Sequence, residues 1–162
     1  MSKRLQRITP FLWFDHQAEE AANFYVSIFE NSGILSTSRY GEGGPGPKGS
    51  VMTISFELEG QEFTALNGGP HFKFTEAVSF VVHCETQDDV DRFWKKLTEG
   101  GGQESQCGWL KDKFGLSWQV VPNALPKLLQ DKDAARSQRV MNALLKMKKL
   151  DIAELQRAHD QN

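Results

Sequence analysis

The chain has 162 residues, of which 39% are hydrophobic and 25% are charged, an ordinary composition for one globular domain. Nineteen basic and 21 acidic side chains leave a formal net charge of -2, so the chain lacks the overall positive field that attracts nucleic acid or an anionic membrane. The two cysteines are too few for a disulfide framework, and no apolar run approaches the roughly 20 residues that a membrane span requires, so we expect a cytoplasmic protein.

The first part of the chain has the pattern of a strand, a helix and three more strands. Phe24, Tyr25 and Ile28 repeat at helical spacing, and Glu59-Gly60 is a tight-turn signal between two β-prone segments. A stretch rich in glycine and proline at 41–49 predicts a loop. The predicted elements are a strand at 8–14, a helix at 17–29, and strands at 34–40, 51–58 and 62–66.

After a turn at 67–70, the same order of elements begins again. Val90, Phe93, Trp94 and Leu97 form the apolar stripe of a second helix, which three consecutive glycines end. The predicted elements are a strand at 77–84, a helix at 87–97, and strands at 103–107, 109–111 and 116–121.

Two spacings align the halves as copies of one βαβββ module. The paired aromatic residues of the two helices are 69 residues apart, which matches Pro10 with Ser79, and the hairpin glycines are 55 residues apart, which matches Thr64 with Gln119. Each module has one helix to cover one face of its sheet, so the other face must close on its twin or on another chain, and we expect a cleft there. The predicted fold is α+β, with a domain at 1–122 that holds modules at about 6–67 and 77–122.

Residues 123–162 have a different, helical pattern. Helices are predicted at 124–130 and 134–150, and a capping box at 151–154 opens a last short helix that runs to about residue 158. The stretch 127–150 carries seven basic and two acidic side chains. A solvated helix face explains this charge, and an interaction module that contacts an acidic partner through the tail is the alternative.

Few residues offer recognisable chemistry. The four histidines show no metal-binding spacing, but His83 lies on the same strand face as Ser79. If the chain is extended through Gly108, then Cys107, Trp109 and Lys111 also share a face, and Trp109 could line a pocket. The loop at 41–49 lacks the lysine and serine or threonine that end a phosphate-binding loop.

Several motifs resemble those of a known family. They are ITPFLWF at 8–14, AEEA at 18–21, FY at 24–25, ALNGGP at 65–70, CGWLKD at 107–112, GLSWQVVP at 115–122 and MKKLDI at 147–152. Together they resemble the PhnB-like, or 3-demethylubiquinone-9 3-methyltransferase-like, branch of the vicinal oxygen chelate (glyoxalase, bleomycin resistance and dioxygenase) superfamily. No glycine motif for adenosylmethionine follows a strand, so the sequence does not support the methyltransferase label.

The resemblance implies a half-open barrel, a homodimer, and a superfamily metal whose ligands come from the first and last strands of each module. Those positions here are Pro10, Thr64, Ser79 and Gln119, and none of them offers a carboxylate or an imidazole. We therefore expect no metal and no other cofactor. Glu62 and His83 lie nearby on the same strand faces, which leaves a displaced metal site open as an alternative.

The sequence favours a protein that binds a small organic molecule in its cleft. No catalytic residue is assigned, and neither a membrane nor nucleic acid is expected as a partner. A true isomerase, lyase or dioxygenase is the further alternative, although a shared fold does not establish a shared function. The predicted ligand-binding residues are Leu12, Thr64, Ser79, His83, Trp109 and Gln119.

Overall fold

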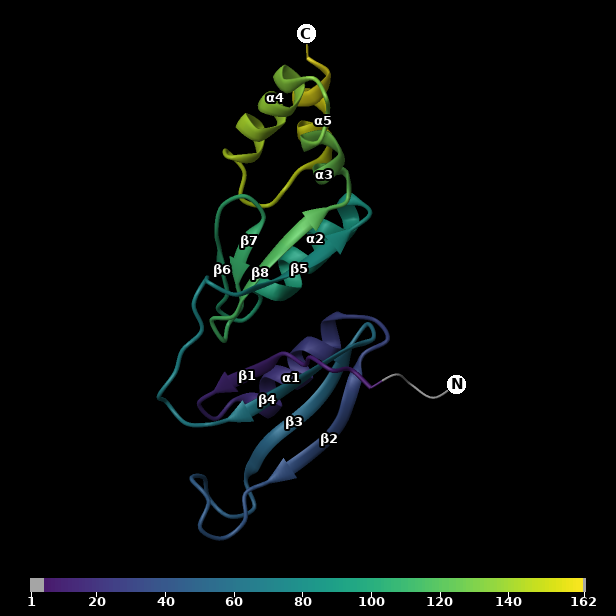
Figure 1. The fold of residues 1–162 in the computed structure, drawn as a ribbon. Coiled ribbons are helices and arrows are strands. Elements are labelled where there is room, and N and C mark those ends of the chain that lie inside the picture. The colour runs from purple at the N-terminus through teal and green to yellow at the C-terminus, as the bar shows by residue number, and fades with distance from the viewer. Residues whose placement is uncertain (1–4, 162) are drawn as a thin grey trace. The chain divides into compact units, whose positions relative to one another are not determined.

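The computed structural model describes residues 5–161, so residues 1–4 and 162, at the outer ends of the predicted domain and tail, lie outside it. The chain forms two compact units with a boundary between Lys73 and Phe74 (Figure 1). Each unit contains one open four-stranded sheet, and the second unit also carries the C-terminal helices. The predicted α+β class is confirmed. Within residues 5–161, no helix has both the length and the apolar character needed to span a bilayer.

The first unit has the sheet order β1-β4-β3-β2, with β1 and β4 parallel and the other neighbours antiparallel. One face of this sheet packs on the helix, where the Tyr25 ring stacks on Phe56 with ring centroids 6.1 Å apart. Phe56 in turn stacks on Phe63 at 5.4 Å, so aromatic rings form much of this core. The elements are β1 (Phe11–Phe14), α1 (Ala18–Ile28), β2 (Gly33–Arg39), β3 (Val51–Leu58) and β4 (Gln61–Asn67).

The second unit repeats this arrangement, with the sheet order β5-β8-β7-β6. Its helix begins at a capping box between Thr86 and Asp89, and it buries Val90 and Trp94 against the sheet. The edge strand β6 is shorter than predicted: only two of the five residues expected at 103–107 are extended. The elements are β5 (Ser79–Cys84), α2 (Gln87–Thr98), β6 (Gln103–Glu104), β7 (Trp109–Lys111) and β8 (Ser117–Pro122).

The register of the strands corrects the predicted match of Pro10 with Ser79. Thr64 pairs with Phe11 in the first sheet, whereas Gln119 pairs with Val81 in the second. If Thr64 matches Gln119, then their strand partners Phe11 and Val81 also match, and these two residues are 70 positions apart in the chain. The helices of the two modules are aligned by a spacing of 69 residues. The two spacings differ because three residues connect β1 to α1 but only two connect β5 to α2. The spacing that aligns the two helices therefore does not align the strands that precede them.

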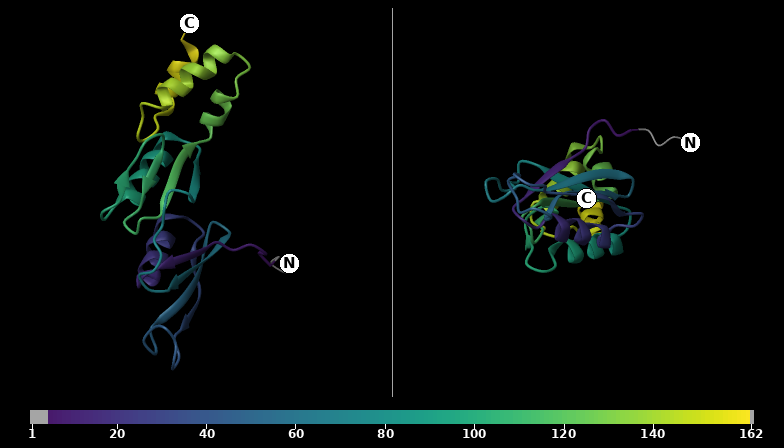
Figure 2. Two further views of the ribbon diagram at one scale, coloured as in Figure 1. Left: turned by 60° about the vertical axis from the view of Figure 1, so that its left-hand side comes forward. Right: turned by 90° about the horizontal axis from the view of Figure 1, so that it is seen from below.

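The C-terminal helices form a small core that packs on the second unit. They are α3 (Ala124–Leu129), α4 (Ala134–Leu144) and α5 (Ile152–Asp160), and Figure 2 shows α4 and α5 side by side. The predicted helix at 134–150 ends early because residues 145–147 form tight turns on the end of α4. Asp151 caps α5, as predicted, through a 2.9 Å bond from the Glu154 N–H. The buried members of this core are Leu125, Leu128, Val140, Leu144, Met147, Leu150 and Leu155.

A histidine joins the last helix to the rest of the tail. The His159 ring lies 2.7 Å from a carboxylate oxygen of Asp160 and 2.8 Å from one of Asp131, which precedes α4. The hydrogen bond with Asp160 has the largest effect and the one with Asp131 the next largest, and both raise the pKa of His159 above its usual value. The Arg139 guanidinium adds two 3.0 Å bonds to the backbone carbonyls of Ala158 and His159. The tail is thus held by polar contacts as well as by its core.

Candidate functional site

Four of the predicted site residues lie on the face of the second sheet that α2 does not cover. Val82 and Cys84 are buried on the α2 side, so Ser79 and His83 point to the opposite face by strand alternation. Trp109 pairs with Gln119 across β7 and β8, which places both on this open face. The Gln119 side-chain amide donates a 2.9 Å hydrogen bond to the Ser79 hydroxyl. The two predicted polar anchors therefore bond to each other.

The two predicted residues of the first unit lie on opposite faces of its sheet. Thr64 pairs with Phe11, which is exposed, whereas Leu12 pairs with Ala65, which is fully buried. Leu12 is only 6% exposed and belongs to the core on the α1 side. The apolar run at 8–14 could not show which alternate positions face the helix, because it is apolar on both faces.

The side chains at the superfamily's metal positions do not suit a divalent ion. The Thr64 hydroxyl lies 3.5 Å from the Ser55 hydroxyl, and Ser79 accepts from Gln119. Only the amide oxygen of Gln119 resembles a useful ligand, whereas zinc and related ions prefer histidine, cysteine and carboxylates. Between residues 5 and 161, no three histidine, cysteine or acidic side chains gather closely enough to hold a metal ion. The residues therefore do not fit the superfamily metal.

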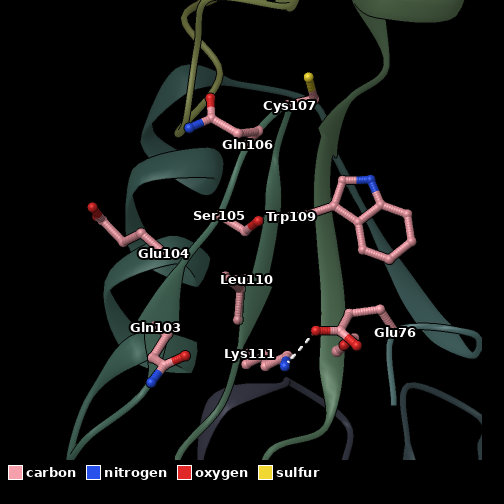
Figure 3. A pocket seen from close by; sticks show the side chains of 10 residues that line it. Glu76, Gln103, Glu104, Ser105, Gln106, Cys107, Trp109, Leu110 and Lys111 are labelled. Atoms are coloured by element: carbon pink, nitrogen blue, oxygen red, sulfur yellow. Dashed lines mark ion pairs between the residues drawn. The ribbon is translucent and has the colours of Figure 1, made fainter.

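A pocket of about 540 Å³ opens along β6 and β7 at the edge of the second sheet (Figure 3). Of the predicted ligand-binding residues, only Trp109 lines it. The connector before β5 and the start of β8 also contribute, so residues distant in sequence meet here. The lining residues are Glu76, Gln103, Glu104, Ser105, Gln106, Cys107, Trp109, Leu110, Lys111 and Ser117.

Ser117 is the unusual member of this lining. It is 1% exposed, and within the described part of the chain its hydroxyl oxygen is buried without a hydrogen-bond partner. Most buried polar atoms in proteins are bonded, because an unsatisfied buried hydroxyl costs about 1–3 kcal/mol. An orphan hydroxyl in a pocket therefore points to a ligand or water that would complete it. Sequence reasoning missed Ser117 because serine at the start of a strand carries no signal of burial.

One charged pair lies on the same open face. Lys111 and Ser117 are register partners on β7 and β8, and the Lys111 ammonium pairs with the Glu76 carboxylate. The hydrogen bond from Lys111 lowers the pKa of Glu76 below its usual value. Figure 3 shows this pair at one end of the pocket, with Trp109 further along the sheet. The pocket thus combines an aromatic side chain, a cation, an anion and a buried hydroxyl.

A left-handed turn forms the other end of the pocket. Cys107 and Gly108 have φ angles of 58° and 84°, so the chain is not extended through Gly108, and the condition for Cys107 to share a strand face with Trp109 is not met. A side chain at Gly108 would place its Cβ 2.9 Å from the Val120 carbonyl oxygen, which explains the glycine. The amides of Cys107 and Gly108 each donate a 2.8 Å bond to the carbonyls of Met147 and Lys148. The tail therefore holds this turn in place.

The comparison with known proteins decides the family. Residues 6–121 match the family model described as 3-demethylubiquinone-9 3-methyltransferase. The chain belongs to this family. A PhnB protein of the same family name from Bacillus cereus is 43% identical, with a TM-score of 0.66; the match covers 72% of this chain and 99% of that one. No curated protein matches the chain.

More distant structures show that this family member has the vicinal oxygen chelate fold. A Pseudomonas aeruginosa protein is 19% identical with a TM-score of 0.60, and the match covers 73% of this chain and 98% of that one. The fosfomycin resistance protein FosX from Listeria monocytogenes is 14% identical with a TM-score of 0.50, and the match covers 78% of this chain and 98% of that one. The family match and the Bacillus cereus relative confirm the PhnB-like resemblance. The methyltransferase in the family name is a label and assigns no activity to this chain.

Proposed function

We propose that this PhnB-like protein binds a small organic molecule in the pocket along β6 and β7, without a metal ion. The observation that carries the proposal is the buried hydroxyl of Ser117, which has no hydrogen-bond partner among residues 5–161. A volume of about 540 Å³ falls within the range of small-molecule sites, which are mainly apolar with a few polar groups that fix orientation. Trp109 supplies the apolar surface, while Ser117 and Lys111 supply the polar groups.

Binding on the open face of the second sheet extends the predicted set of site residues. Ser79, His83 and Gln119 lie on the same face as Trp109, so a ligand longer than the pocket would meet them. Thr64 and Leu12 belong to the first unit and are not needed for this proposal. A homodimer and a cytoplasmic location remain part of the proposal, and the two free cysteines agree with a reducing compartment.

Contacts within the chain occupy two of the seven basic residues on which an interaction module would depend. The Lys149 ammonium already pairs with the Asp91 carboxylate at 2.8 Å. The Arg139 guanidinium is occupied by two backbone carbonyls of the last helix. Because these cations hold the tail in place, they are less available to an acidic partner than the sequence suggested.

The indole N–H groups provide a direct test of the pocket. Three of the four tryptophans donate hydrogen bonds, from Trp13 to Gly69, from Trp94 to Glu104 and from Trp118 to Asp112, whereas Trp109 lies in the pocket. In a screen of small organic molecules by ¹H–¹⁵N NMR, we expect hits to shift the Trp109 indole signal and leave those of Trp13 and Trp118 unchanged; the Trp94 N–H bonds to the lining residue Glu104 and is not used as a control. The Trp109→Phe variant identifies the Trp109 signal. A screen in which no compound moves the Trp109 signal at millimolar concentration would refute the proposal.

A further inference from the structure

We infer that the pocket takes an organic carboxylate with a flat apolar body, which names the ligand class and rests on the function proposed above. Its polar end has two donors that could meet one carboxylate. Lys111 and Ser117 are register partners on adjacent antiparallel strands and lie on the same face. Such partners have Cβ atoms about 4.5–5.5 Å apart, close enough for both side chains to reach one group between them.

The donors at this end of the pocket are not exhausted. A lysine ammonium has three N–H donors, and a single contact joins the Lys111 ammonium to a Glu76 carboxylate oxygen. The Ser117 hydroxyl can donate one hydrogen bond, and within the described residues nothing accepts it. A group that accepts from both would complete the buried hydroxyl and add a charge-assisted bond to the cation. A carboxylate has the acceptor oxygens and the negative charge that this pair of donors requires.

A carboxylate of the chain itself already contacts Lys111. Glu76 belongs to the connector before β5 and its side chain is 62% exposed, so the carboxylate comes from outside the sheet. We interpret Glu76 as an internal counterpart of the ligand's acid group, because both would compete for the ammonium of Lys111. Removal of the Glu76 charge should therefore strengthen the binding of an anionic ligand.

The apolar body of the ligand would lie against Trp109. The indole is half-buried on the open face, two residues before Lys111 on the same strand, so ring and cation lie on one side of the sheet. Aromatic side chains offer a flat apolar surface to a planar ligand. The class that satisfies both ends is an aryl or arylalkyl carboxylate.

Two matched probes test this inference, phenylacetate and its neutral isostere phenylacetamide. We titrate each at low ionic strength and follow the Trp109 indole signal by NMR. Phenylacetate should bind about tenfold more tightly than phenylacetamide, because hydrogen bonds to a charged acceptor are roughly twice as strong as neutral ones. Lys111→Met and Ser117→Ala should each weaken phenylacetate about fivefold to tenfold, whereas Glu76→Gln should strengthen it about twofold to fivefold.

Matched variants separate local contacts from general charge effects. Lys113→Met removes the same charge from a residue outside the pocket lining, and Glu85→Gln does so for an exposed acid beyond β5. Neither should change the affinity ratio of the two probes. Equal affinities for both probes would overturn the carboxylate inference while leaving the pocket intact. Failure of both probes and of the wider screen to move the Trp109 signal would instead overturn the proposed function.

Discussion

Replacing Ser117 with alanine should stabilise the folded protein, the opposite of what most buried substitutions do. The hydroxyl oxygen is buried and has no partner in the part of the chain that the structure describes, so the folded state bears its desolvation cost of about 1–3 kcal/mol. Alanine removes the oxygen and keeps the Cβ, so little packing is lost. We expect the free energy of unfolding to rise by about 1–2 kcal/mol and the melting temperature to rise by about 2–4 °C for each kcal/mol.

The assay is urea unfolding at constant pH, with the midpoint and the slope fitted separately so that stability is distinguished from compactness. Hydrogen exchange at the amides of β8 assigns the change to the second unit. Ser38→Ala is the matched control, because that hydroxyl lies 2.6 Å from the Thr53 hydroxyl and its loss should destabilise by about 0.5–1.5 kcal/mol. If Ser117→Ala instead loses stability, the hydroxyl is already satisfied, and the main reason for placing a ligand there fails.

Three further predictions concern the histidine, the metal and the tail. Because folding raises the pKa of His159, protonation of this histidine stabilises the folded state. This stabilisation is complete below pH about 6.5 and is lost as the pH rises through the folded pKa. Urea unfolding should show this loss of stability in the wild type and not in His159→Asn. Calorimetric titration with zinc, nickel and manganese should detect no stoichiometric micromolar binding, and such binding abolished by Gln119→Ala would contradict the metal-free proposal. Gln87→Ala removes two hydrogen bonds to the tail, of 2.8 and 3.0 Å, so it should lower the free energy of unfolding by about 1–2 kcal/mol. The same variant should increase the rate at which Cys107 reacts with a thiol reagent. The control Gln138→Ala, at an exposed position, should do neither. The thiol reagent reports on Cys107 because Cys84 is buried, which raises the pKa of its thiol to about 11.

The sequence was sufficient for the module and its repetition, because both depend on regular patterns. The apolar stripe of the second helix predicted α2 to within one residue of its end; its members are Val90, Phe93, Trp94 and Leu97. The β-prone runs at 51–58 and 109–111 predicted β3 and β7 at their observed bounds. The same patterns failed where the chain changes direction. A turn shorter by one residue shifted the match of Pro10 with Ser79, and no periodicity indicates the length of a turn.

The candidate site was predictable only in part. Strand alternation placed Ser79, His83, Trp109 and Gln119 on a common face, since parity is a local property of each strand. The pocket itself depends on which edge of the sheet is left open and on how a connector folds back. Glu76 and Ser117 meet Lys111 only through that tertiary arrangement, so the residues that matter most for the proposal had no distinguishing sequence pattern.

The two amide bonds from Cys107 and Gly108 to Met147 and Lys148 have a practical consequence for the design of expression clones. The family match ends at residue 121, so trimming this protein to the matched region would be a natural first step toward crystals. That cut would strip two acceptors from the turn beside the pocket and leave Val121, now packed on the tail core, facing water. A shortened clone that misbehaves in solution would thus reveal a lost support and say nothing against the pocket, so ligand studies belong on the full chain.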